Sequence, residues 1–87
     1  MKASTLKMIG ELSVATDLAL RERYKAKMAR AALFRKWTNE TGEYYDSSVL
    51  GEDQDPEVEA ARAAYLATTK ALARARTKLR AAIRKAA

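Results

Sequence analysis

Mostly apolar and small residues recur at alternating intervals of three and four along the last third of the chain. The positions are Val58, Ala61, Tyr65, Thr68, Leu72, Ala75, Leu79, Ala82 and Ala86. This is the heptad spacing of a helix that packs lengthwise against a partner helix. Every second position carries a small side chain, which lets the partner backbone come close. The pattern predicts a helix over about 56–85 in a tight antiparallel pair.

The first part of the chain, from about residue 4 to residue 40, also has a helical period, but it carries two apolar stripes. The stripe expected to face the second helix comprises Met8, Leu12, Ala15, Ala19, Ala26, Ala29, Leu33 and Trp37. The other stripe has larger side chains and comprises Leu6, Ile9, Leu20, Tyr24, Ala31 and Phe34. One stripe suffices for pairing within the chain, so the second needs another cover. We therefore predict a homodimer interface made by Leu6, Ile9, Leu20, Tyr24 and Phe34.

Between these helices, residues 42–55 lose the helical period and collect turn-forming residues. Asp55 is suited to cap the second helix, and Pro56 suits the first helical position because its missing N–H costs nothing there. The connector is longer than the usual link between bundled helices. The predicted fold is all-α, a single domain over 1–87 that forms a long antiparallel helical hairpin and dimerises into a four-helix bundle.

Composition excludes most chemistry. The 87 residues include no Cys and no His, which removes disulfides, thiolate metal sites and the usual general base. No Gly-rich phosphate loop or paired-carboxylate motif is present, and the connector acids fit a calcium loop poorly. We expect no enzyme activity, no cofactor and no metal. No long apolar run indicates a signal peptide or membrane span, so we expect a cytoplasmic protein.

Charge is distributed in three blocks. The net charge is +6, and a basic first helix, an acidic connector and a basic second helix follow one another. One cluster, on the first helix, is expected to be partly neutralised by the connector acids. It comprises Arg21, Arg23, Lys25, Lys27, Arg30, Arg35 and Lys36. The other cluster lies near the end of the second helix and comprises Lys70, Arg74, Arg76, Lys78, Arg80, Arg84 and Lys85.

The cluster on the second helix has two interpretations. It is either a solvated face or a surface that contacts nucleic-acid phosphates. No aromatic residue lies among these cations, so base stacking has no platform and any nucleic-acid binding would be independent of sequence.

The favoured function is a non-catalytic protein–protein interaction module, such as a small inhibitor, adaptor or assembly factor that binds a larger macromolecular complex. Aromatic residues carry much of the energy of protein interfaces, although these could also cover the end of the hairpin. The predicted protein-binding residues are Trp37, Tyr44, Tyr45, Asp46, Glu52 and Asp53. The two alternatives are a sequence-independent nucleic-acid-binding protein and a structural subunit of a larger assembly.

Overall fold

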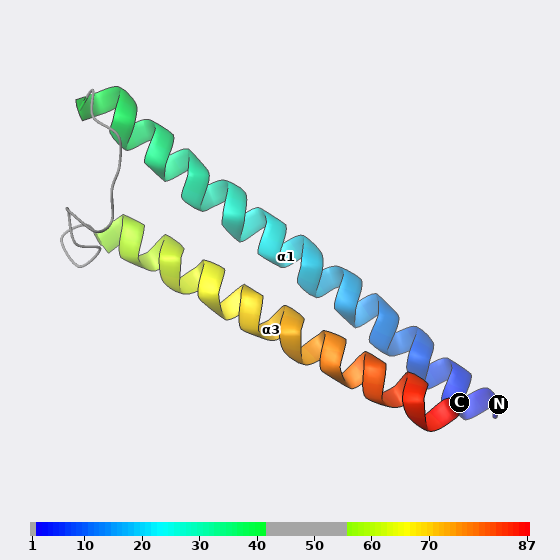
Figure 1. Ribbon diagram of the computed structural model, residues 1–87. Coiled ribbons are helices and arrows are strands. Elements are labelled where there is room, and N and C mark those ends of the chain that lie inside the picture. Colours follow the sequence, from blue (N-terminus) through cyan, green and yellow to red (C-terminus); the bar gives the residue numbers. More distant parts are fainter. Residues whose placement is uncertain (1, 42–55) are drawn as a thin grey trace.

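The computed structural model describes residues 2–41 and 56–87. They form two helices, α1 (Ala3–Thr41) and α3 (Pro56–Ala86), and no strand occurs within these ranges. The helices pack against each other and run antiparallel, so that the two ends of the chain lie at the same end of the hairpin (Figure 1). Each observed helix boundary is within one residue of its predicted position. The expected all-α helical hairpin is confirmed.

Local sequence explains the helix ends. The carbonyl of Lys2 accepts hydrogen bonds from the backbone N–H groups of Thr5 and Leu6, both at 3.1 Å, although α1 has no acidic residue in its first turn to favour the positive end of the helix dipole. In contrast, α3 has Pro56 at its first position with Glu57 and Glu59 in the first turn. The start of α3 is therefore better specified by its sequence than the start of α1.

The core of the hairpin is a single seam. On α3 it follows the predicted heptad positions, all nine of which are buried or half-buried. The best buried are Val58 and Leu72, each 3% exposed, and Ala82, 5% exposed. No other residue among those described is fully buried, because two helices can cover only one face of each other.

On α1 the seam differs from the predicted stripe. Nine half-buried positions alternate by four and three, and they are Thr5, Ile9, Leu12, Thr16, Ala19, Arg23, Ala26, Arg30 and Leu33. Near the end of α1, Ala31, Phe34 and Thr38 are half-buried as well. Three members of the predicted stripe, Met8, Ala15 and Ala29, are exposed instead.

The predicted stripe and the seam share Leu12, Ala19, Ala26 and Leu33, which lie seven residues apart. At the alternate positions the contact uses Ile9, Thr16, Arg23 and Arg30, of which Ile9, Thr16 and Arg30 each come one residue after a member of the stripe. The face of α1 that packs on α3 is therefore rotated about the helix axis from the predicted one.

Candidate functional site

The outer face of α1 exposes large apolar side chains. We call Leu6, Leu20 and Tyr24 the outer stripe; their exposed fractions are 56%, 42% and 64%. They are three of the five predicted dimer-interface residues. The other two, Ile9 and Phe34, are half-buried, and Ile9 occupies the seam with α3. The structure therefore leaves most of the predicted interface open.

A hollow of about 500 Å³ lies beside the outer stripe and is lined by Leu20, Tyr24, Arg21 and Lys25. Both cations are held along the helix by exposed ion pairs, Arg21 with Asp17 at 3.1 Å and Lys25 with Glu22 at 3.2 Å. Such pairs stabilise a helix by only about 0.3–0.5 kcal/mol.

The basic cluster of α3 is exposed at all seven predicted positions. After Glu59, α3 carries no acidic residue. The two ion pairs found within the described ranges both lie inside α1, and neither includes a member of this cluster. Within the part of the chain that the structure describes, Arg74 is the one member of the cluster whose side chain makes a hydrogen bond, in which its Nε donates to the Lys70 carbonyl at 3.4 Å. The cluster is thus a set of solvated cations whose charge the packed helices do not neutralise.

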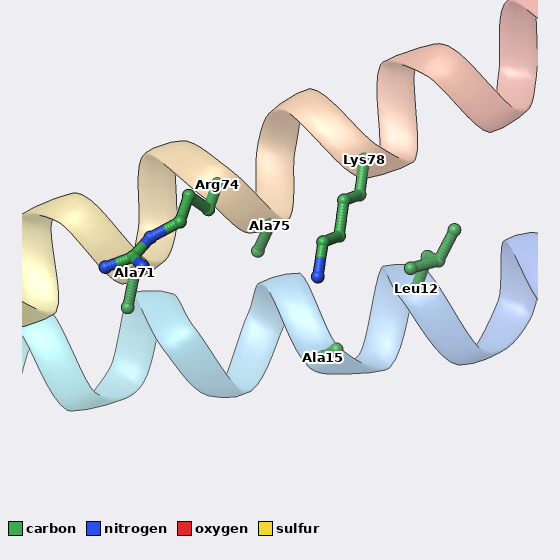
Figure 2. A pocket seen from close by; sticks show the side chains of 6 residues that line it. All are labelled: Leu12, Ala15, Ala71, Arg74, Ala75 and Lys78. Atoms are coloured by element: carbon green, nitrogen blue, oxygen red, sulfur yellow. The ribbon is translucent and has the colours of Figure 1, made fainter.

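A groove of about 440 Å³ separates the helices beneath two of these cations. Four of its lining residues are small or apolar, namely Leu12, Ala15, Ala71 and Ala75, and the other two are Arg74 and Lys78. Figure 2 shows Arg74 running back along α3 toward Ala71, whereas Lys78 extends across the groove with its amine directed toward α1 near Ala15. Small side chains on both helices leave the groove open.

A second hollow, of about 420 Å³, lies at the end of the hairpin where both termini meet (Figure 1). It is lined by Lys2, Thr5, Met8, Ala82, Lys85 and Ala86. The hollow brings Lys2, from the start of the chain, beside Lys85, from its end. Positive charge therefore continues from α3 onto the N-terminal end of α1.

An arginine and tyrosine cluster at the middle of the seam was missed by the sequence reasoning. Arg23 and Arg30, both expected to lie beside the connector acids, are half-buried against α3. Their guanidinium carbons lie 5.4 Å and 5.8 Å from the centre of the Tyr65 ring, which is the geometry of cation–π contacts. Arg30 also lies 4.7 Å from the centre of the Phe34 ring. The heptad spacing of the two arginines is the signal that could have placed them.

Several predicted residues lie outside what the structure describes. They are Tyr44, Tyr45, Asp46, Glu52 and Asp53 of the connector, together with the side chain of Trp37. The protein-binding site expected there, and the expected neutralisation of the α1 cations by connector acids, stay predictions.

The described residues lack two other kinds of feature. Within 2–41 and 56–87 no group of three or more His, Cys, Asp or Glu side chains is arranged to hold a metal ion. Neither α1 nor α3 combines the length and apolar character needed to span a membrane.

No protein-family model, curated protein or solved structure matches this chain. The candidate functional surfaces are therefore the outer stripe of α1 and the basic cluster of α3.

Proposed function

We propose that the chain is a non-catalytic protein-interaction module, acting as a small inhibitor, adaptor or assembly factor, and that it is itself a homodimer. The observation that supports this is the outer stripe of α1. The seam buries three residues, two of them large, whereas Leu6, Leu20 and Tyr24 are exposed to solvent. A small domain with so little core gains stability when such a stripe is covered by another chain.

The spacing of two outer-stripe residues and the half-buried Phe34 favours a second copy as the partner that covers this face. Leu6, Leu20 and Phe34 follow one another at equal intervals of fourteen residues, which is two heptads. Two α1 helices that cross antiparallel about Leu20 bring each Leu20 against its equivalent, and each Leu6 toward Phe34 of the other copy. A two-fold interface is self-complementary in this way. Four helices then form the bundle, with both α3 helices on the outside.

The test is the mass of the purified protein in solution, measured by light scattering, with two charge substitutions. Leu20→Glu places a carboxylate at the centre of the proposed interface, and we expect the mass to fall from twice the chain mass to the chain mass of 9.7 kDa. Leu18→Glu is the matched control, because Leu18 is 55% exposed and lies on another face of the same helix. We expect this control to remain a dimer.

Two results would reject a dimer formed through the outer stripe. One is a monomeric wild-type chain at micromolar concentration. The other is equal loss of mass in both variants, which would mean that the interface does not use the outer stripe. Circular dichroism of each variant checks that the helices persist, and because both sites are exposed we expect helicity to be retained.

A further inference from the structure

We propose that α3 carries a second, independent binding surface that takes the phosphate backbone of a nucleic-acid duplex. The surface is a strip of four cations, Lys70, Arg74, Lys78 and Lys85, which we call the phosphate strip. All four are exposed. At 100° per residue they fall within about 80° of the helix circumference, so they share one face.

The spacing of the strip suits a regular array of phosphates. Its members are four, four and seven residues apart, or about 6, 6 and 10 Å along the helix axis. Along a duplex axis there is one phosphate charge per ~1.7 Å when both strands are counted. The whole strip is about 22 Å long and straight, so it can contact several phosphates along one side of a duplex.

The groove beneath the strip leaves room for a phosphate to reach its cations. Arg74 runs back along α3 toward Ala71, Lys78 extends across the groove toward α1 (Figure 2), and the groove holds about 440 Å³. Nε of Arg74 is engaged with the Lys70 carbonyl, which orients the guanidinium and leaves its Nη groups for the paired hydrogen bonds that arginine makes to phosphate. At the end of the strip, Lys2 joins Lys85 at the same hollow.

The chemistry around the strip favours a duplex over other polyanions. No aromatic residue follows Tyr65 on α3, so the bases of a single strand have nothing to stack on. The residues between the cations on this face are Ala67, Ala71, Thr77 and Ala81, which do not form the large apolar face of a helix that inserts into a lipid surface. A rigid duplex presents phosphates at constant spacing without either requirement.

The test measures binding of the full chain to a labelled mixed-sequence DNA duplex of about 20 base pairs by fluorescence anisotropy, at roughly 50 and 200 mM salt. With about four phosphates neutralised, affinity should fall roughly 100-fold between these salt concentrations. An RNA duplex, vesicles of anionic phospholipid and poly-glutamate serve as the other arms. Comparable binding of DNA and RNA duplexes is expected, because both offer the same phosphates.

Two charge-matched variants locate the site. Arg74→Gln with Lys78→Gln removes two members of the strip, and we expect roughly tenfold weaker binding at low salt and a salt slope reduced by about two. Arg76→Gln with Arg80→Gln removes the same charge from another face of α3, and we expect at most about a threefold loss from the long-range field. Both pairs are exposed, so circular dichroism should show unchanged helicity.

Three outcomes would overturn the proposal. Equal losses in the two variants would show that net charge alone attracts the duplex. Absence of binding at low salt would reject the surface outright. Vesicles or poly-glutamate bound more tightly than either duplex would assign the cations to a different partner.

Discussion

Arg23 and Tyr65 join the two helices at the middle of the hairpin. The Nη2 group of Arg23 donates a hydrogen bond to the Tyr65 hydroxyl at 3.0 Å, and its Nε donates to Oγ1 of Thr69 at 3.3 Å. Oγ1 of Thr69 in turn donates to the Tyr65 carbonyl at 2.9 Å. Among the described residues, the two bonds donated by Arg23 are the only side-chain hydrogen bonds between α1 and α3, so they help to set the register in which the seams meet.

Substitutions at Tyr65 should distinguish what its hydroxyl and its ring each contribute to stability. Tyr65→Phe keeps the ring beside Arg23 and Arg30 but removes the hydrogen-bond acceptor, and we expect a loss of about 1 kcal/mol in the free energy of unfolding. Tyr65→Leu also removes both cation–π contacts, each worth about 0.5–1 kcal/mol at a part-exposed site, so its loss should be larger. Thermal melts followed by circular dichroism measure the difference. Equal melting temperatures for the two variants would show that the ring contacts contribute nothing.

The seam should depend strongly on its best-buried leucine. Leu72 is 3% exposed, and Leu72→Ala should lower the free energy of unfolding by about 2–5 kcal/mol, because the removed atoms lose their burial and leave a cavity in the seam. Leu66→Ala on the same helix is the control; Leu66 is 43% exposed, and we expect a loss of about 1 kcal/mol or less. Urea unfolding measures both losses. Similar losses would mean that the hairpin does not use this seam in solution.

Gly10 lowers the stability of α1. It lies inside the helix, and a Cβ placed there would meet nothing within 4 Å. Gly10→Ala should therefore raise the free energy of unfolding by about 0.5–1 kcal/mol, since alanine loses less backbone entropy in a helix. The reverse substitution, Ala63→Gly at an exposed position of α3, should lower the free energy of unfolding by a similar amount. Destabilisation by Gly10→Ala would show that another chain packs against this glycine.

Salt should stabilise the fold. All 17 Lys and Arg residues lie in the described ranges. The acids there are Glu11, Asp17, Glu22, Glu40, Glu57 and Glu59. Repulsion among the cations is screened by salt, whereas the two ion pairs are exposed and weak. We expect the melting temperature to rise with sodium chloride concentration. A fall would mean that attractive charge pairs outweigh the repulsion.

The sequence by itself determined the helices and the seam of α3. Pro56 with the acids that follow it specifies where α3 begins, and the heptad from Val58 to Ala86 is the only continuous apolar or small-residue line on that helix. The exposed cations of α3 could also be predicted, because every one of them falls outside that line. These features depend on local spacing, which a single helix already contains.

Only the tertiary structure decided which face of α1 packs. Two apolar stripes compete there, and neither helix propensity nor periodicity ranks them, since each is compatible with the same helix. The contact with α3 follows a 3.5-residue seam that crosses both stripes, takes in Ile9, and places Arg23 and Arg30 against Tyr65. Long arginine stems can fill such positions while their charged ends reach a hydroxyl and an aromatic ring. That arrangement depends on residues some forty positions apart, and it leaves Leu6, Leu20 and Tyr24 exposed.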